Sequence, residues 1–176
     1  MIRCLSSALA LTLGLCATTL AFDGGPGNPY CFGVGCPCGN DDPDAGCINS
    51  SGDGGLLTVT GSSSVSADDA QFHGTQLSRQ SVVLLVMADA QQQVPFQNGL
   101  LCLAGDIQRM QQHQNTGQTG SATFSHVVER YSWQGIPIVP GDTRHFQLWF
   151  RDVPSGQSPC GFSSNLTNAT TIVFTP

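Results

Sequence analysis

The sequence predicts an all-β protein, built as an antiparallel β-sandwich or a small barrel. First, the chain of 176 residues has no Lys and only one Glu, the residues that commonly cover exposed helix surfaces. Second, Gly, Ser, Thr, Asn and Asp are abundant, which is typical of turns and short strands. Third, short apolar or alternating segments recur between turn residues, and no segment keeps a period of 3.6 residues.

The first 21 residues have the layout of a secretory signal peptide. Arg3 supplies a positive charge, residues 5–17 are apolar but too short for a membrane span, and residues 19–21 suit signal peptidase cleavage. Cys16 lacks the small preceding residue of a lipoprotein signal, so no lipid is expected there. No later apolar run reaches the ~18 residues of a spanning helix. We therefore expect a secreted or cell-surface protein.

Two sections should follow the signal peptide. Residues 22–55 hold four cysteines, many glycines and several Asp residues, with almost no apolar periodicity. We expect them to form an irregular, disulfide-tied N-terminal cap without its own core. Residues 56–176 carry the strand signals and should form the sandwich domain.

Strand signals are spread along the second section. The Gln-rich segment Gln108–Gln118 is compatible with a strand running into a loop or with one surface helix. The other signals are a strand near Leu57, Val59 and Val65, an apolar strand over Val82–Met87, a tight turn at Asn98-Gly99, and strands over Leu100–Ala104, Ser121–Val128, His145–Arg151 and through Ile172 and Phe174.

The segment His145–Arg151 has the clearest alternation. Its apolar face, which should lie in the core, carries Phe146, Leu148 and Phe150. The opposite face should be exposed, and it carries His145, Gln147, Trp149 and Arg151. In the strand expected before it, His126 shares a face with Phe124 and Val128, which predicts a hydrogen-bonded core residue.

Six cysteines remain after cleavage, and an even number in an exported chain predicts three disulfides. The spacing of the first four contains no C-x2-C pair, as a structural zinc site usually would, and does not match a ferredoxin pattern. Six cysteines allow 15 pairings. Our hypothesis pairs Cys102 with Cys160, the two cysteines of the strand-rich section, and leaves Cys31, Cys36, Cys38 and Cys47 to pair among themselves.

An acidic loop offers a weak Ca²⁺ candidate at Asp41, Asp42 and Asp44, because clustered carboxylates suit a hard cation. The EF-hand pattern fails there, so a solvated acidic loop is favoured and no cofactor is expected. The net charge of −6 disfavours nucleic acid as a partner. No HExxH motif, G-x-S-x-G elbow or phosphate-binding glycine loop is present.

Exposed aromatic residues are the best indication of binding. Trp149 and Arg151 lie on the polar face of their strand, and Tyr131 and Trp133 lie in or beside a loop. Aromatic faces beside polar residues are common where β modules bind sugars or protein surfaces. The alternative is that Trp149 packs under a loop or against the N-terminal cap.

Several motifs resemble an uncharacterised family of secreted, disulfide-containing bacterial β modules. The motifs are Cys31-Phe32-Gly33 with Cys36-Pro37-Cys38-Gly39-Asn40, Pro140-Gly141-Asp142-Thr143 leading to Trp149-Phe150-Arg151-Asp152, and Pro159-Cys160-Gly161-Phe162 with Thr167-Asn168-Ala169. The resemblance spans nearly all of the mature chain and implies an exported β module. It implies no activity and no catalytic residues.

Three classes of function are compatible with these observations. The first is a non-catalytic extracellular structural or interaction module, whose partner would be a polysaccharide or a surface protein. The second is a carbohydrate-binding module that uses the exposed aromatics. The third is a secreted hydrolase whose site is built from residues distant in the sequence.

Cleavage after Ala21 is the first testable prediction. Intact-mass analysis of exported protein should give a chain that begins at Phe22, because residues 19–21 form the best cleavage site. A mass that retains residues 1–21, or that includes lipid on Cys16, would contradict it.

Overall fold

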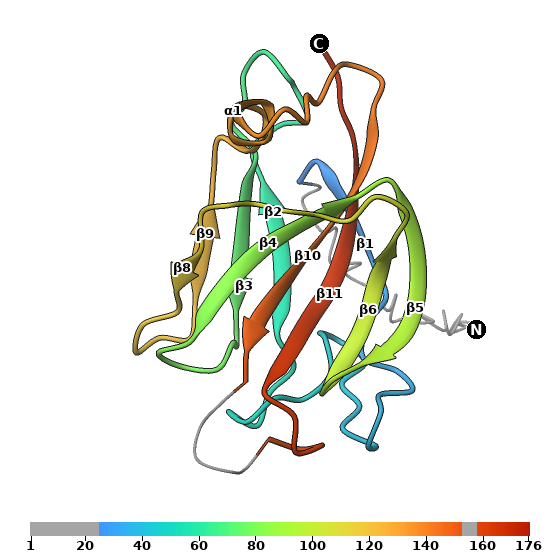
Figure 1. The fold of residues 1–176 in the computed structure, drawn as a ribbon, viewed down its shortest axis with the longest axis vertical. Coiled ribbons are helices and arrows are strands. Elements are labelled where there is room, and N and C mark those ends of the chain that lie inside the picture. The colour runs from blue at the N-terminus through green and yellow to red at the C-terminus, as the bar shows by residue number, and fades with distance from the viewer. Residues whose placement is uncertain (1–24, 153–157) are drawn as a thin grey trace, which may run out of the picture.

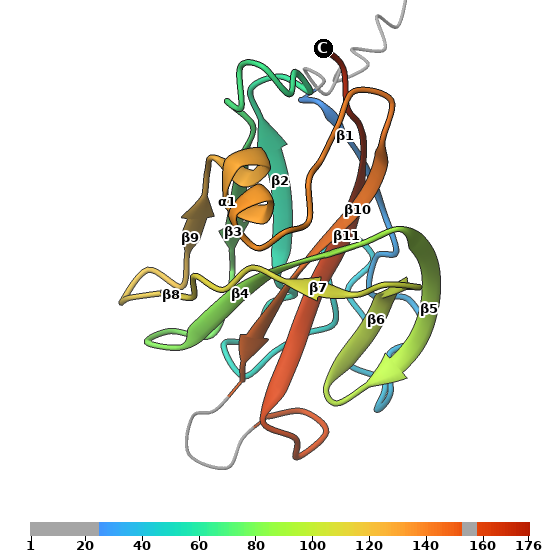
Figure 2. The same ribbon diagram turned by 45° about the horizontal axis from the view of Figure 1, so that its top comes forward.

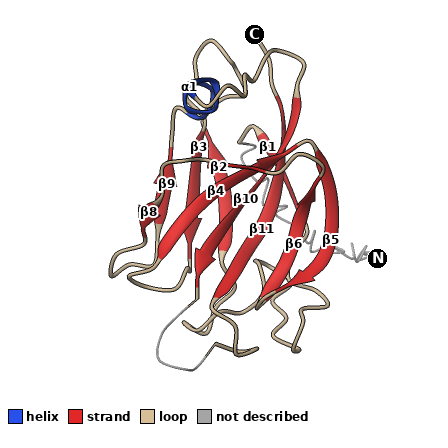
Figure 3. Ribbon diagram, viewed as in Figure 1, coloured by secondary structure: helices blue, strands red, loops and turns tan. Residues whose placement is uncertain are grey.

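The computed structural model describes residues 25–152 and 158–176. Antiparallel sheets dominate it, and the described strands form open sheets rather than a closed barrel (Figures 1 and 3). This confirms the all-β prediction and selects the sandwich over the barrel. Figure 2 shows β2, β3, β9 and the helix on one side of the central strands and the β5–β6 hairpin on the other.

The largest sheet is six-stranded and has the order β1-β11-β10-β4-β7, with β8 also paired to β4. Its strands are β1 (Gly27–Tyr30), β4 (Val82–Ala88), β7 (Gln108–Arg109), β8 (Gln114–Asn115), β10 (Thr143–Arg151) and β11 (Ser164–Val173). The Gln-rich segment therefore forms two short strands with irregular connections.

Two smaller sheets cover parts of the large one. The remaining elements are β2 (Leu56–Thr60), β3 (Gln71–Thr75) and β9 (Ala122–Phe124) in one sheet, β5 (Ala90–Phe96) and β6 (Gly99–Ala104) in a hairpin, and the helix α1 (Val127–Trp133). Within residues 25–152 and 158–176, no helix has the length and apolar character needed to cross a membrane.

The main core lies between the large sheet and the β2-β3-β9 sheet. As the alternation predicts, Phe146, Leu148 and Phe150 of β10 point into this core and are completely buried. The Phe146 ring packs against Phe72 of β3, with ring centroids 4.7 Å apart. This contact joins the two sheets directly.

The other face of β10 is exposed only toward its end at Arg151, which corrects the prediction for His145 and Gln147. His145 is buried, and Gln147 is completely buried. The Gln147 amide donates to the carbonyls of Leu100 (2.9 Å) and Thr167 (2.7 Å), and its oxygen accepts from the Cys102 N–H (3.1 Å). The β5–β6 hairpin covers this face, and Gln147 joins hairpin to sheet through hydrogen bonds.

The strand expected over Ser121–Val128 ends at Phe124, and a helix follows it. His126, expected in the core, is instead exposed at the helix N-cap with φ +53°. The cap comes from a distant residue, because the Asp68 carboxylate accepts hydrogen bonds from the N–H groups of Val128 and Glu129, both at 3.0 Å. A carboxylate at this position satisfies free amides and favours the helix dipole.

The N-terminal section contributes a strand as well as loops. Strand β1 pairs with β11 at the edge of the large sheet, so part of the expected cap belongs to the sandwich. The residues between β1 and β2 are irregular, with isolated bridges such as Gly33 to Asp42.

The disulfide pattern overturns the predicted Cys102–Cys160 bond. The three bonds are Cys31–Cys102, Cys36–Cys47 and Cys38–Cys160, with Cα–Cα distances of 6.1, 5.9 and 5.6 Å. Two of them connect the N-terminal section to the strand-rich section. The cap is therefore cross-tied to the hairpin and to the segment before β11.

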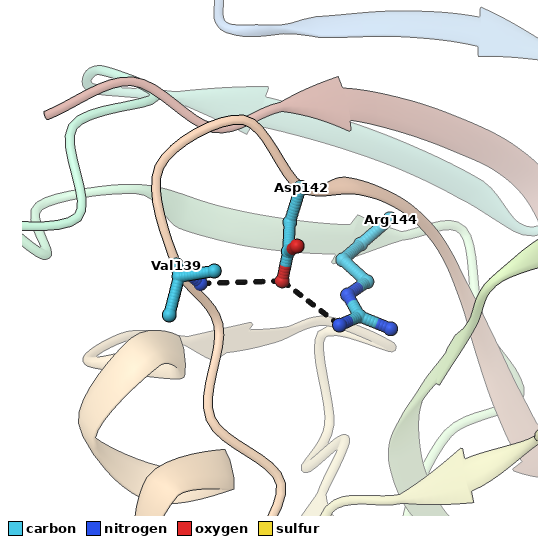
Figure 4. Close-up of polar contacts among 3 residues, drawn as sticks. All are labelled: Val139, Asp142 and Arg144. Atoms are coloured by element: carbon cyan, nitrogen blue, oxygen red, sulfur yellow. Dashed lines mark hydrogen bonds and ion pairs between the residues drawn. The ribbon is translucent and has the colours of Figure 1, made fainter.

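The turn before β10 is held by one ion pair. The Asp142 carboxylate accepts from Arg144 Nη2 at 2.8 Å and from the Val139 N–H at 3.2 Å (Figure 4). The Arg144 hydrogen bond is the main cause that keeps the pKa of Asp142 below its usual value. The contact closes the Pro140-Gly141 turn predicted from the sequence.

A buried carboxylate organises the end of the sandwich where β10 stops. The side chain of Asp152 accepts from the Ser50 N–H (2.9 Å), Ser78 Oγ (2.7 Å) and Asn98 Nδ2 (2.7 Å). Asp152 is 1% exposed, and no cation pairs with it among the described residues. Three segments distant in the sequence therefore meet on one carboxylate.

The disulfide pairing can be tested by peptide mapping under non-reducing conditions. The three bonds named above should be recovered, and a Cys102–Cys160 peptide would contradict the structure. Replacing Cys31 and Cys102 by Ala should lower the free energy of unfolding by about 4 kcal/mol. The matched Cys36–Cys47 double variant should lose about 3 kcal/mol, because its bond closes a shorter loop.

The structural role of the buried Asp152 carboxylate can be tested by denaturant unfolding. Asp152→Ala should lower the free energy of unfolding by about 3 kcal/mol or more, because two buried donors and one half-buried donor lose their acceptor. Asp53→Ala is a control at an exposed carboxylate and should change stability by less than about 0.5 kcal/mol. If both substitutions lowered the free energy of unfolding equally, the hydrogen bonds to Asp152 would not be important for stability.

Candidate binding site

Trp149 and Arg151 lie together on one side of β10, as the sequence predicts. The guanidinium carbon of Arg151 lies 5.4 Å from the centre of the Trp149 ring, a cation–π distance. Arg151 Nη1 also donates to Ser163 Oγ at 3.3 Å. These two contacts orient the guanidinium of an otherwise exposed arginine.

Trp149 is only partly exposed. Its ring packs beside a small apolar cluster formed by Val86, Ala88 and Leu103, so it lies against the β5–β6 hairpin rather than against the N-terminal cap. Arg151 covers part of the ring. Trp149 therefore positions Arg151 and is not a free stacking platform.

A shallow concavity opens beside this pair, and we call it the arginine hollow. Its walls come from β4, β7, β10, the tip of the hairpin and the segment that enters β11. The lining residues are Leu84, Phe96, Gln97, Arg109, Trp149, Arg151, Ser163 and Ser164.

The hairpin tip that forms one wall of the arginine hollow is fixed by Asn98. This side chain is completely buried. It donates to Asp152 and to the Phe162 carbonyl (2.9 Å), and it accepts from the Phe162 N–H (3.1 Å). The Asn98 carbonyl accepts from Asn40 of the cap at 2.8 Å. The tip is therefore held from three directions.

Gln97 beside it has φ +56°, a conformation that non-glycine residues adopt infrequently. The turn centres on Gln97 and Asn98, since Phe96 pairs with Gly99 across the hairpin. The predicted turn was thus shifted by one residue. The anchored Asn98 holds the backbone at a position where Gln97 lines the arginine hollow.

The arginine hollow is positively charged although the chain is acidic. Among the described residues there are five arginines, Arg79, Arg109, Arg130, Arg144 and Arg151, and two of these line the hollow. No Asp, Glu or His belongs to its lining. The neighbouring Asp152 is turned inward onto its three donors.

Trp133 lies elsewhere, at the end of α1, and has 72% of its surface exposed. It lines a second concavity, the helix hollow, where Arg130 contacts the Gln112 side chain. Figure 1 places α1 near one end of the molecule and the tip of the β5–β6 hairpin near the other. The helix hollow is lined by Met110, Gln111, Gln112, Arg130, Trp133 and Gln134.

Tyr131, expected beside an exposed loop, is instead completely buried in the main core. Its hydroxyl donates to the carbonyls of Leu85 (3.3 Å) or Gln108 (3.4 Å). Burial raises the pKa of this phenol well above its ordinary value. Tyr131 therefore anchors α1 to the sheet and is not available to a ligand.

The histidines form no cluster with acidic residues that would suggest a metal. His145 shares a hydrogen bond with Thr171 Oγ1 at 2.8 Å and lies edge-on to Tyr30. Desolvation lowers the pKa of His145, and the charge of Asp89 partly opposes this shift. Within the described ranges, no group of three or more His, Cys, Asp or Glu side chains could hold a metal ion.

The acidic loop uses its carboxylates on its own backbone. Asp41 accepts from the N–H groups of Gly35 and Cys36, and Asp42 accepts from those of Asp44 and Gly54. These bonds give Asp41 and Asp42 a structural role in folding the loop.

Three asparagines match the N-glycosylation pattern, and all three are buried. Their amide groups donate to main-chain carbonyls inside the protein: Asn49 to Gln76, Asn165 to Cys47 and Ile48, and Asn168 to Leu57. In the folded protein these side chains are structural and are not accessible for glycosylation.

The sequence pattern predicts two residues of the arginine hollow, Trp149 and Arg151, and gives no signal for Phe96 and Arg109. Phe96 precedes the turn and Arg109 lies in the Gln-rich segment. The local sequence around either residue does not predict that the two lie close together. Hydrogen bonding of β7 to β4, with Arg109 opposite Val86, brings Arg109 to this surface.

Comparisons with known proteins found no matching family model, no matching curated protein and no matching solved structure. The resemblance to secreted bacterial β modules therefore stays a prediction.

Proposed function

We propose that this protein is a secreted, non-catalytic interaction module and that the arginine hollow is its contact surface. The observation that carries the proposal is the combination of a fixed scaffold with exposed recognition groups. Asn98, Asp152 and the Cys31–Cys102 bond hold the hairpin that forms one wall. Preorganised walls reduce the ordering cost of binding.

The chemistry of both hollows favours binding over catalysis. The described residues that line them supply guanidinium, amide, hydroxyl and aromatic groups and include no carboxylate, imidazole or thiol. General acid–base catalysis needs a group that exchanges a proton near neutral pH, which a guanidinium does not do.

Export is supported by the covalent structure as well as by the predicted signal peptide. Three disulfides are typical of proteins that reside in an oxidising environment outside the cytosol. An exported module meets polysaccharides and surface proteins, which are the partner classes expected from the sequence.

The second candidate is neutral sugar binding at the helix hollow. A tryptophan with 72% of its surface exposed, next to Gln111 and Gln112, presents an aromatic face beside amide groups. Tryptophan rings can stack on the apolar faces of sugars, and amides can bond their hydroxyls.

Retention of purified residues 22–176 on insoluble cell-envelope material and on a panel of insoluble polysaccharides tests the proposal. Phe96→Ala should reduce retention several-fold without changing the melting temperature, because 40% of the Phe96 surface is exposed. Trp149→Ala should reduce both the retention and the melting temperature, because Trp149 also packs against the hairpin. Trp133→Ala should reduce retention only if the helix hollow binds the polysaccharide.

Val139→Ala is the matched control, since Val139 is an exposed apolar residue outside both hollows. Its retention should equal that of the wild type. Release of soluble sugar by the wild type, or no retention on any material, would contradict the proposal.

A further inference from the structure

We propose that the arginine hollow binds a carboxylated sugar unit, of the uronic acid type, within a largely neutral polysaccharide. This inference rests on the proposed function and names the ligand class of the same site.

The two arginines form a site for a planar anion. Arg151 extends from β10 and is oriented by Trp149 and Ser163, whereas Arg109 comes from β7. Neither forms an ion pair with an acidic side chain among the described residues. A guanidinium presents parallel N–H groups that match both oxygens of a carboxylate. The hollow therefore offers two guanidinium charges that no acidic side chain among the described residues neutralises, and Arg151 has N–H groups besides the one that bonds Ser163.

The remaining groups suit a sugar ring. Phe96 presents a partly exposed aromatic surface on which the C–H face of a pyranose can lie. The side chains of Gln97 and Ser163 can donate and accept hydrogen bonds with hydroxyl groups. The ligand would thus contact an apolar surface and several polar groups on a fixed wall.

The net charge limits how acidic the ligand can be. A chain with a formal charge of −6 repels a densely charged polyanion, whereas short-range contacts in the hollow attract a single carboxylate. A polysaccharide whose neutral backbone carries isolated carboxylates avoids this repulsion and still offers a carboxylate to the hollow. A glucuronic-acid-bearing xylan is a probe with this pattern.

The experiment compares that xylan with the same xylan after reduction of its carboxylates to alcohols. Wild-type protein should bind the acidic form at least about tenfold more tightly, since hydrogen bonds to charged groups are stronger than neutral ones. Arg151→Gln and Arg109→Gln should each remove most of this preference. Arg151→Lys should recover only part of it, because Lys keeps the charge and loses the planar fork.

Arg79→Gln is the matched control, because Arg79 is exposed outside both hollows and its loss changes the net charge equally. It should bind as the wild type does, and an equal loss would overturn the inference as a general charge effect. Polyglutamate that competes as well as the acidic xylan would overturn it in favour of a protein partner.

Equal binding of the two xylans, or binding of neither, would also overturn the inference. If the protein is still retained on cell-envelope material, the proposed function stands and only the ligand class fails. If that retention is absent too, both proposals fail.

Discussion

The structure depends on a buried carboxylate that pairs with no cationic side chain among the described residues. Asp152 directly follows β10, and its oxygens accept hydrogen bonds from the cap at Ser50, from the segment before β4 at Ser78 and from the hairpin turn at Asn98. A buried charge is tolerated only where such donors surround it. These bonds therefore set where the strand ends and where two distant loops lie.

Buried amide side chains of the large sheet also bond the segments that surround it. Gln147 bonds the β5–β6 hairpin, Asn165 bonds the N-terminal section and Asn168 bonds β2. The apolar cluster between Trp149 and the hairpin is small, so hydrogen bonds and the Cys31–Cys102 disulfide supply attachment that a larger core would otherwise provide. The prevalence of Asn, Gln, Ser and Thr in the sequence has a structural use here.

This construction connects the fold to its proposed role. The segments that meet near Asp152 also form walls of the arginine hollow, so the contacts that stabilise the fold also hold the recognition groups in place. The Asp152 carboxylate accepts from three internal donors and forms no ion pair with the adjacent Arg151. An acidic protein can in this way present a local cationic surface.

Composition and alternation were enough to predict the β class, most of the longer strands and the face of β10 that enters the main core. The alternation also identified Trp149 and Arg151 as neighbours, because residues two apart on a strand share a side. What covers each face depends on contacts that the local pattern does not contain. The hairpin buries His145 and Gln147, Asp68 caps a helix where alternation predicted strand, and the fold brings Cys31 to Cys102. Periodicity shows which residues share a face, whereas the partner of that face depends on contacts between segments distant in the chain. Such contacts also bring Phe96 and Arg109 to the arginine hollow.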